Sequence, residues 1–458
     1  MKKYLVILIS IFTSTIYPQV GPNSNWYFGS NAGITFNSGT PVALTNGSLL
    51  TTEGVATISD NSGNLLFYTN GVSVWNRNHL IMNNGTGLLG DQSSTQSSII
   101  VQKPGSNSIY YIFCSDNDAG PNGITWSEVD MNLFGGMGSI TSNKNIPLYS
   151  PSCEKLCAVR HCNNQDIWII SHDWNNNIFR CWSVTSLGVG VIQAWSIAGL
   201  VPSGATQGSY GQLKASPDGK KLAACYYGLV GGINKIEIYD FNPSTGFVTN
   251  AQTISTELGI YGCEFSPNGR VLYAGCNQGL LLQWNLCAGT LPQIQSTRTV
   301  ISNAGPFIGS LQLGPDGKIY VARNNTSLSV INSPNTIGLG CSYSNLSVSL
   351  AGRSSRMGLP NFASYYNQQT TNIIPNQISC DTYEFSTILN TISCQNINYS
   401  YIWEFGDGMT SNLPNPQHQF QTGNWIVTLT IETGCVPIIG NTTVNVVSSV
   451  PTGPIYKE

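Results

Sequence analysis

The sequence predicts an all-β protein in which a ring of small sheets precedes a β-sandwich. Charged residues make up only 9% of the 458 residues, whereas soluble domains usually carry about 25%. Lys, Glu and Arg are among the best helix formers, so their scarcity favours strands and turns. A repeated strand–turn–strand pattern supports the same class, and a second, shorter strand pattern follows it.

Three segments share one plan: an apolar strand, a turn that contains Pro and Gly, and a second strand. They read "YGQLKASPDGKKLAACYY", "YGCEFSPNGRVLYAGC" and "IGSLQLGPDGKIYVAR" and begin at Tyr210, Tyr261 and Ile308. Proline presets φ and glycine permits a positive φ, so each turn joins two antiparallel strands. The turn glycines Gly219, Gly269 and Gly317 are 50 and 48 residues apart. This spacing is typical of a four-stranded propeller blade.

Looser copies of the pattern begin at Gly54, Ser97 and Leu156, which brings the number of recognisable blades to six. A seventh blade can be assembled from "NWYFGSNAGITFN" near residue 25 and "GLPNFASYY" from Gly358. Strands from both ends of the region would then close the ring and leave only short edges. We therefore expect a seven-bladed β-propeller over residues 22–368, with six blades as the alternative.

The N-terminus has the layout of a secretory signal peptide over residues 1–18. Two lysines precede an apolar run from Tyr4 to Phe12, which is too short to span a bilayer. No later run is long enough to span a membrane, and no cysteine follows the leader to accept a lipid. We expect a secreted or outer-surface protein in which many of the thirteen cysteines form disulfides. A net charge of −3 gives no basic surface for nucleic acid.

Particular sequence runs of the expected propeller resemble those of a known family. The runs "NWYFGSNAGITFN", "TTEGVATISDNSGNLLFYTNGVSVWN", "STQSSIIVQKP" and "GLPNFASYY" are similar to the N-terminal propeller of large surface proteins from gliding bacteria that use type IX secretion. The propeller itself resembles WD-repeat-like and lactonase-like propellers, although it has no Gly-His to Trp-Asp signature. The resemblance implies export and surface display, and with this context we expect a role in adhesion or gliding.

After an expected linker at residues 369–376, a small β-sandwich is expected at 377–448, followed by a tail at 449–458. The segments "YEFST", "YIWEFGDGMTSNLPNPQHQF" and "GNWIVTLTIETG" resemble a PKD domain, which has an immunoglobulin-like fold. The resemblance implies a core tryptophan, a hairpin turn and a returning strand at Trp403, Phe405, Gly406, Asp407, Gly408, Pro416 and His418. The chain ends without the sorting domain of such proteins, so we expect a shortened relative or a truncated sequence.

Asp407 and His418 could be a catalytic pair or part of the architecture. An Asp in a Gly-Asp-Gly turn accepts hydrogen bonds from turn amides without any catalytic role. His418 alternates with Phe420 along an expected strand, as a packed histidine would. The pair has neither a nucleophile nor an orienting group beside it in the sequence. We therefore expect an architectural pair.

Two other segments could hold a metal ion. In "SDNDAGPNGITW", Asp116 and Asp118 have the spacing that lets oxygens converge on calcium, although a plain polar loop is the competing interpretation. The segment "CEKLCAVRHC" imitates a zinc site with Cys153, Cys157, His161 and Cys162. Residues on one strand cannot all point to one side, so disulfides or buried thiols are the expected outcome.

Glu53 is expected at the start of an innermost strand, at the mouth of the central channel, where propellers often bind ligands. Its context, "TTEGVATISD", also resembles the opening motif of gluconolactonase-like propellers, whose acidic residue holds a divalent metal. Gln96, Gln212, Gln312 and Arg356 are expected at further channel positions, although they do not supply the Asn and Asp ligands of such a site. Trp174, Tyr226 and Tyr227 could stack on a sugar ring or simply fill the space between blades.

These observations predict a non-enzymatic interaction protein that binds a surface glycan or a protein of the secretion or gliding machinery. The PKD domain would act as a spacer, and calcium is the one cofactor that the sequence suggests. The alternative is an extracellular propeller enzyme, either a metal-dependent lactonase or a glycan-active hydrolase. The two hypotheses differ in one structural feature, which is whether several carboxylates converge at one mouth of the channel.

Overall fold

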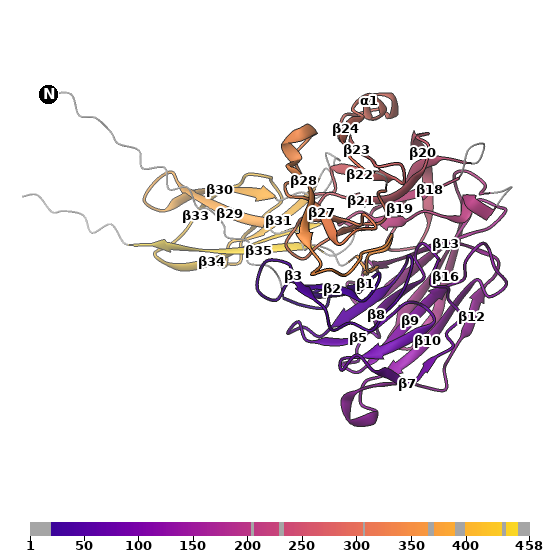
Figure 1. Ribbon diagram of the computed structural model, residues 1–458. Helices are drawn as coiled ribbons and strands as arrows, with labels where there is room; N and C mark the ends of the chain where they lie inside the picture. The colour runs from indigo at the N-terminus through magenta and orange to yellow at the C-terminus, as the bar shows by residue number, and fades with distance from the viewer. Residues whose placement is uncertain are drawn as a thin grey trace, which may run out of the picture.

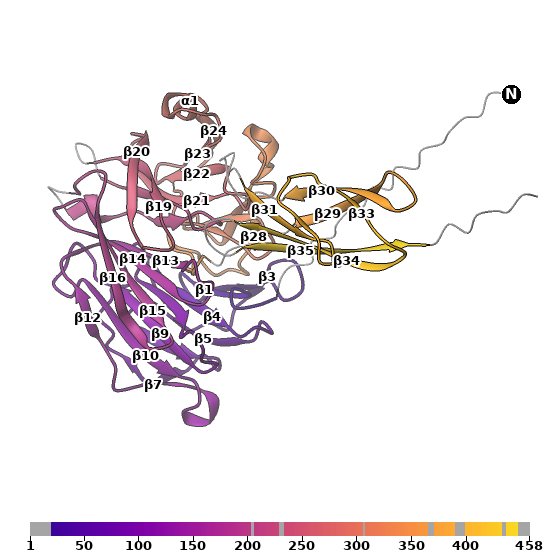
Figure 2. The same cartoon turned by 180° about the vertical axis from the view of Figure 1, so that it is seen from behind.

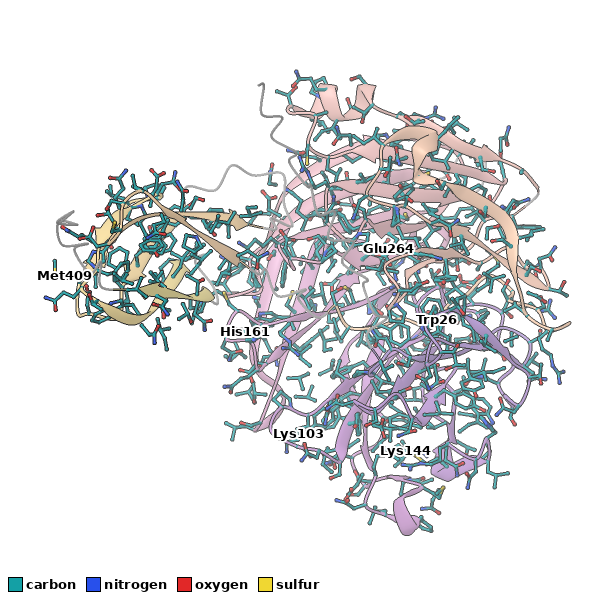
Figure 3. The ribbon with its side chains drawn as sticks, turned by 90° about the vertical axis from the view of Figure 1, so that its left-hand side faces the viewer. Trp26, Lys103, Lys144, His161, Glu264 and Met409 are labelled. Atoms are coloured by element: carbon teal, nitrogen blue, oxygen red, sulfur yellow. The ribbon has the colours of Figure 1, made fainter. Side chains whose placement is uncertain are left out.

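Two groups of β-sheets make up the structure, a computed structural model that describes residues 20–202, 206–228, 233–305, 307–364, 371–389, 399–432 and 437–447. The larger group runs from indigo to orange in Figures 1 and 2, and the smaller group runs from orange to yellow. Figure 3 places Trp26 and Glu264 in the larger group and Met409 in the smaller one. The expected signal peptide and C-terminal tail lie outside the described residues.

The larger group begins with two sheets of unequal size. The first has three antiparallel strands: β1 (Asn25–Phe28), β2 (Ala32–Thr35) and β3 (Val42–Leu44). The second has nine strands, with β4 (Ala56–Ser59), β5 (Leu65–Thr69), β6 (Ser73–Asn76), β7 (Ile81–Thr86), β8 (Ser98–Gln102), β9 (Ile109–Ser115), β10 (Ile124–Asp130), β11 (Ser139–Ile140) and β12 (Ile146–Tyr149). A single parallel pair, Asn83 with Ser139, joins its two halves.

Four sheets of four antiparallel strands follow. They comprise β13 (Ser152–Arg160), β14 (Ile167–Asp173), β15 (Ile178–Thr185) and β16 (Gly188–Ile197); β17 (Leu213–Ala215), β18 (Lys221–Tyr226), β19 (Lys235–Phe241) and β20 (Val248–Ser255); β21 (Ile260–Phe265), β22 (Val271–Cys276), β23 (Leu280–Asn285) and β24 (Thr299–Asn303); β25 (Leu311–Leu313), β26 (Ile319–Val321), β27 (Ser327–Ile331) and β28 (Tyr343–Ser349). Each sheet is a chain-order meander, so the region is propeller-like.

Helical structure is scarce in the described residues, as the composition predicted. It consists of α1 (Leu291–Ser296) and the 3₁₀ turns η1 (Phe134–Gly136), η2 (Thr206–Ser209) and η3 (Gly338–Cys341). The repeated turns have the predicted geometry, because Gly219, Gly269 and Gly317 adopt φ values of 63°, 66° and 75°. A residue with a side chain would be strained at these positions.

The chain returns to its beginning after β28, but not in the way that we expected. The segment from Gly358 was expected to add an inner strand to the first sheet, and this prediction is wrong. Instead, isolated bridges pair Pro360 with Val55 and Ser364 with Val159. Pro360 has no amide hydrogen to extend a ladder. A Cβ on Gly358 would lie 1.6 Å from the carbonyl oxygen of Glu53, so the segment passes close beside β4.

Asn361 fastens this return segment to three innermost strands. Its backbone N–H donates to the Val55 carbonyl at 2.8 Å. Its side-chain Nδ2 donates to the carbonyls of Leu156, at 2.7 Å, and Ser98, at 3.4 Å. Nearby, Trp26 contacts the ring of Phe362. The closure is therefore made by side-chain packing and by one amide rather than by a continuous strand.

The smaller group consists of two sheets that enclose an aromatic core. One contains β29 (Thr371–Gln377), β30 (Thr382–Leu389) and β33 (Gln417–Gln419); the other contains β31 (Ser400–Glu404), β32 (Thr410–Ser411), β34 (Gly423–Glu432) and β35 (Ile438–Val446). Trp403 is fully buried beside Phe385 and Phe405. Strand β29 occupies most of the stretch that was predicted to be a linker.

Most described cysteines are unpaired, contrary to our expectation of many disulfides. Cys162 and Cys287 are disulfide-bonded. Free thiols are found at Cys114, Cys153, Cys157, Cys181, Cys225, Cys263, Cys276, Cys341 and Cys380, of which only the last is exposed. Small apolar thiols fit the space between packed strands well, which accounts for their burial.

We predict that Asn361→Ala lowers the free energy of unfolding by about 1–3 kcal/mol, because the buried carbonyls of Leu156 and Ser98 lose their donor. Denaturant unfolding monitored by tryptophan fluorescence would measure the change. Asn132→Ala is the matched control, since its Nδ2 bonds Ser108 at an exposed position. Equal stability of the two variants would contradict the fastening role of Asn361.

Candidate functional site

Six side chains associated with four sheets meet at the starting ends of the innermost strands. Glu53 and Thr95 precede β4 and β8, Glu154 lies near the start of β13, and Tyr210 and Tyr261 precede or begin β17 and β21. Asp118 joins them from the loop between β9 and β10. The set, called the acidic cluster below, comprises Glu53, Thr95, Asp118, Glu154, Tyr210 and Tyr261.

Direct hydrogen bonds connect the members of the acidic cluster. Tyr261 donates its hydroxyl to Glu53 Oε2 at 2.8 Å. Glu154 Oε2 accepts from the backbone N–H and the hydroxyl of Thr95, at 2.7 and 3.0 Å. Glu154 Oε1 accepts from the Asp118 N–H at 3.0 Å, and the Tyr210 hydroxyl donates to the Asp118 carboxylate. The Tyr261–Glu53 pair interacts with the other four residues through Thr95 and through the charge of Glu154.

Lys155 holds the loop that carries Tyr210. Its buried ammonium group donates to the carbonyls of Ser209, Tyr210 and Gly211, at 3.0, 2.8 and 3.2 Å. It also lies 4.7 Å from the centre of the Tyr226 ring, within the range of a cation–π contact. An ammonium group saturated in this way serves as a positioning group for the loop of Tyr210.

The two glutamates of the acidic cluster hold protons unusually tightly. Burial, together with the nearby charge of Glu154, raises the pKa of Glu53 to about 8. Burial also raises the pKa of Glu154 to about 7, although hydrogen bonds from Asp118 and Thr95 oppose the shift. Near neutral pH such groups can accept or donate a proton, and they can bind hydroxyl groups as either acceptor or donor.

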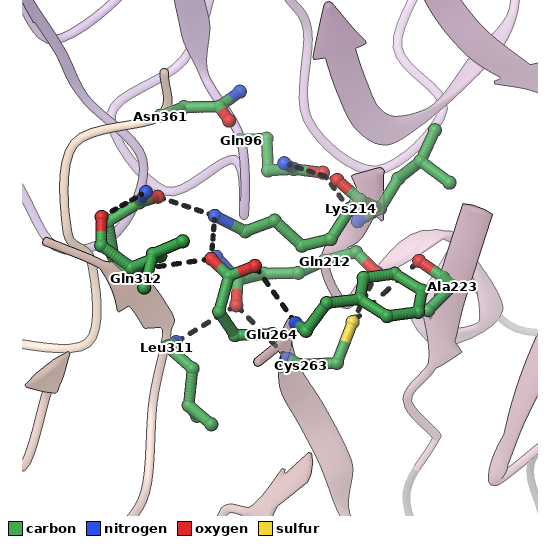
Figure 4. A network of polar contacts seen from close by, with 12 residues as sticks. Gln96, Gln212, Lys214, Ala223, Cys263, Glu264, Leu311, Gln312 and Asn361 are labelled. Carbon is green, nitrogen blue, oxygen red and sulfur yellow. Dashed lines mark hydrogen bonds and ion pairs between the residues drawn. The ribbon is translucent and has the colours of Figure 1, made fainter. Parts of the chain in front are cut away.

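The predicted channel residues Gln96 and Gln212 have a structural role instead. Gln96 Oε1 accepts from the N–H groups of Leu156 and Leu213, at 3.2 and 2.8 Å. Gln212 Oε1 accepts from the N–H groups of Cys263 and Leu311, at 3.2 and 3.0 Å (Figure 4). Each glutamine joins neighbouring sheets by satisfying two backbone donors, so its side-chain oxygen is already occupied.

A buried ion pair occupies the same region further along the strands. Lys214 Nζ lies 3.3 Å from Glu264 Oε2 and donates to Gln312 at 2.5 Å (Figure 4). Glu264 also accepts from the N–H groups of Phe265 and Leu313. With these partners the pair is well satisfied, as buried charges must be. Gln312 is therefore part of an internal network.

Two other predicted binding residues lie apart from the acidic cluster. Arg356 is exposed, and its Nε donates to Ser30 Oγ at 2.8 Å. Trp174 was considered as an exposed stacking platform, but it is only 8% exposed. Its placement supports the alternative that the ring fills the space between sheets.

The expected metal ligands have other partners. Asp116 accepts from the N–H groups of Asn117 and Asn122, at 3.0 Å each, while Asp118 faces Tyr210. In "CEKLCAVRHC", Cys153 and Cys157 are buried thiols and Cys162 is disulfide-bonded. Within the described ranges, no group of three or more His, Cys, Asp or Glu could hold a metal ion. Calcium binding by Asp116 and Asp118 stays a prediction.

Asp407 and His418 do contact each other in the smaller group of sheets. His418 Nε2 lies 2.6 Å from Asp407 Oδ2, and the His418 ring stacks on Phe405 at 4.0 Å. Asp407 Oδ1 accepts from the Met409 N–H at 3.0 Å. Since every contact fastens the turn to the core, the geometry supports the architectural interpretation.

Sequence reasoning missed Glu154, Thr95, Tyr210 and Tyr261 as members of the acidic cluster. A signal was present, because Tyr210 and Tyr261 occupy the same first position in two aligned repeats. Glu154 was hidden in a segment that was read for its cysteines. Three carboxylates, those of Glu53, Asp118 and Glu154, do converge, and this is the arrangement that the enzyme hypothesis requires.

Residues 370–444 match the family model of the PKD domain. The PKD1 domain of the Vibrio cholerae metalloprotease PrtV shares 20% identity, with 18% of this chain and 98% of that chain covered and a TM-score of 0.16. A putative 6-phosphogluconolactonase from Bacteroides fragilis shares 15% identity, with coverages of 80% and 94% and a TM-score of 0.39. KlHsv2 with a Gly-Ser linker in place of loop 6CD shares 9% identity, with coverages of 67% and 88% and a TM-score of 0.36.

No curated protein sequence matches the chain. None of the described helices is long and apolar enough to cross a membrane. The comparisons therefore show a PKD domain at residues 370–444.

We predict that the protein loses stability as the pH rises from about 4.5 toward 8. In this window the folded state keeps a proton on Glu53 that the unfolded chain releases, because the folded pKa is the higher one. Glu53→Gln cannot ionise, so the loss should be smaller in this variant. Chemical denaturation at several pH values would test this, with Glu128→Gln as control. Parallel pH profiles for the wild type and Glu53→Gln would contradict the raised pKa.

We predict that Asp407→Asn destabilises the PKD domain by about 1 kcal/mol at neutral pH. Burial opposes ionisation of Asp407, but bonds from His418 and Met409 outweigh it and lower the pKa of the carboxyl. The stabilisation is therefore present above about pH 4 and is lost as the pH falls through the lowered pKa. Hydrogen exchange of residues 400–420 would report it, with Glu404→Gln as the control, because Glu404 is exposed. Unchanged exchange in Asp407→Asn would contradict this role.

Proposed function

We propose that the protein is a secreted or cell-surface interaction protein that binds a hydroxyl-rich ligand, a glycan, through the acidic cluster. The binding region would be a seven-bladed propeller, in which the nine-stranded sheet counts as two blades joined by one bridge. The PKD domain would serve as a spacer. The resemblance of the N-terminal region to surface proteins of gliding bacteria supports export by type IX secretion and a place in adhesion or gliding.

The observation that carries this proposal is the convergence of carboxylates and tyrosines from five innermost-strand starts. Carboxylate oxygens accept pairs of hydrogen bonds from sugar hydroxyls, and protonated carboxyls can also donate. Tyrosine rings adjoin them: Tyr227 lies 6.1 Å from both Tyr210 and Tyr261, stacked on the first and edge-on to the second. Aromatic faces and hydrogen-bonding groups side by side suit a ring that is apolar on its faces and polar at its rim.

A second candidate, a propeller enzyme, is favoured by one observation. Glu53 and Glu154 have raised pKa values and interact electrostatically, and paired carboxyl groups are the usual acid and base of glycoside hydrolysis. In such an enzyme Glu53, the more weakly acidic of the two, would be the proton donor. A lactonase would also need a metal ion, and the described residues offer no group of ligands for one.

We predict that the mature protein binds members of a glycan array and that Glu53→Gln weakens binding at least about tenfold, which corresponds to about 1.4 kcal/mol. Binding would be measured with calcium and with a chelator, so that a role of Asp116 and Asp118 is tested in the same experiment. Glu128→Gln is the matched control, because this carboxylate lies away from the acidic cluster and bonds Thr141.

An array without any hit would contradict glycan binding. Turnover of a glycoside or lactone substrate that is abolished in Glu53→Gln would instead establish the enzymatic candidate. Binding that is equal in the wild type and in Glu53→Gln would place the ligand elsewhere on the protein.

A further inference from the structure

Two buried thiols lie together at the boundary between two neighbouring sheets. Cys225 is on β18 and Cys263 is on β21, and neither has any exposed surface. Strand β18 belongs to the sheet of β17–β20, whereas β21 begins the next sheet. Both cysteines belong to one apolar cluster, which also contains Ala223. A covalent bond between them would therefore join two sheets.

Two backbone carbonyls place Cys263 Sγ beside the backbone of Cys225. The Gln212 carbonyl accepts from the Cys225 N–H at 2.9 Å and contacts Cys263 Sγ at 3.8 Å. Cys263 Sγ also lies 3.7 Å from the Ala223 carbonyl (Figure 4). Ala223 and Cys225 point to the same side of β18, because alternate residues of a strand do so. Cys263 Sγ therefore lies against the stretch of β18 that carries Cys225.

The strand pairing keeps one other pair of buried thiols apart. Cys157 and Cys181 lie on β13 and β15, and Ile170 of β14 pairs with both of them. They are thus separated by a whole strand, about 10 Å. Among the described residues, neither Cys225 nor Cys263 belongs to a group of three or more side chains that could hold a metal ion.

We propose that Cys225 and Cys263 form a disulfide in the exported protein. The thiolate of one cysteine attacks a small-molecule disulfide such as oxidised glutathione, forming a mixed disulfide and releasing one thiolate. The thiolate of the second cysteine then displaces the other half of the reagent. Two protons leave the protein, and the two electrons reduce the reagent to two thiols.

The chemistry of the site determines when this bond forms. Burial raises the pKa of the Cys225 thiol, and the contact with Cys263 raises it further, although Lys155 opposes the shift. The thiolate is the reacting species, so oxidation in the closed fold is slow. The disulfide therefore forms while the two sheets are still docking, in an oxidising compartment. In this respect it rests on the export part of the proposed function.

A disulfide between Cys225 and Cys263 would affect the acidic cluster through residues next to the two cysteines. Tyr261 is two residues before Cys263 on β21, and Gln212, whose carbonyl contacts Cys263, follows the loop of Tyr210. A covalent link at this depth would limit the separation of the two sheets that carry these tyrosines. It would also restrict the unfolded chain by closing a loop.

The test uses the full mature chain, purified after export to an oxidising compartment and also refolded with oxidised glutathione. The protein is denatured without reductant, alkylated and digested, and the peptides are identified by mass spectrometry. We expect a linked Cys225–Cys263 peptide that disappears after reduction. Reductant should lower the melting temperature by several degrees more in the wild type than in Cys225→Ser/Cys263→Ser, because the disulfides of Cys162 and Cys287 are reduced in both.

Alkylation of both cysteines in all molecules, or a link from either one to Cys276 instead, would overturn the proposal. Cys157→Ser/Cys181→Ser is the matched control, because it removes two buried thiols that the proposal leaves unpaired. If the double variant of Cys225 and Cys263 fails to fold, the peptide map of the wild type still shows whether the disulfide is present. A linked peptide together with a blank glycan array would retain the disulfide and reject the proposed ligand.

Discussion

Closure of the larger group of sheets depends on the chain crossing back, after its last strand, onto residues near its beginning. Asn361 supplies hydrogen bonds to the starts of β4, β8 and β13, and Trp26 meets the rings of Tyr320 and Phe362 at 5.4 and 5.8 Å. The first sheet has only three strands and a fully buried β1. Without this crossing, aromatic side chains would be exposed to water, at a cost of about 25 cal/mol for each Å² of apolar surface.

The same closure creates a polar centre. The side chains there differ in how many of their hydrogen-bonding atoms already have partners. Gln96 and Gln212 each bind two backbone N–H groups from neighbouring sheets, and the Lys214–Glu264 pair has further partners of its own. These groups hold the sheets together and have little capacity left for a ligand. The acidic cluster differs, because its two glutamates share a low-dielectric region without a cation positioned between them. Function is therefore best sought at this end of the strands.

Sequence patterns predicted the local structure well where the residue type has one conformational role. The positive φ of Gly219 and its repeats, the burial of Trp403 and the turn around Asp407 all follow from such residues. Prediction failed at Gly358–Ser364, where a strand-like composition forms isolated bridges, because Pro360 and a close backbone contact prevent a ladder. The roles of Gln96 and Gln212 could not be predicted either, because a polar side chain at the centre can face a ligand or bond to a neighbouring backbone.

The sequence by itself determined the all-β class, the repeated hairpins and the PKD motif, because each depends on residues near one another in the chain. Only the tertiary structure decided which polar residues meet. Glu53 and Tyr261 are separated by 208 positions, and Thr95 and Glu154 by 59. Their contacts arise from the curvature and order of successive sheets. The raised pKa of Glu53 follows from burial and from the nearby charge of Glu154, although the hydrogen bond from Tyr261 opposes it, and neither cause can be read from the residue's immediate neighbours in the chain.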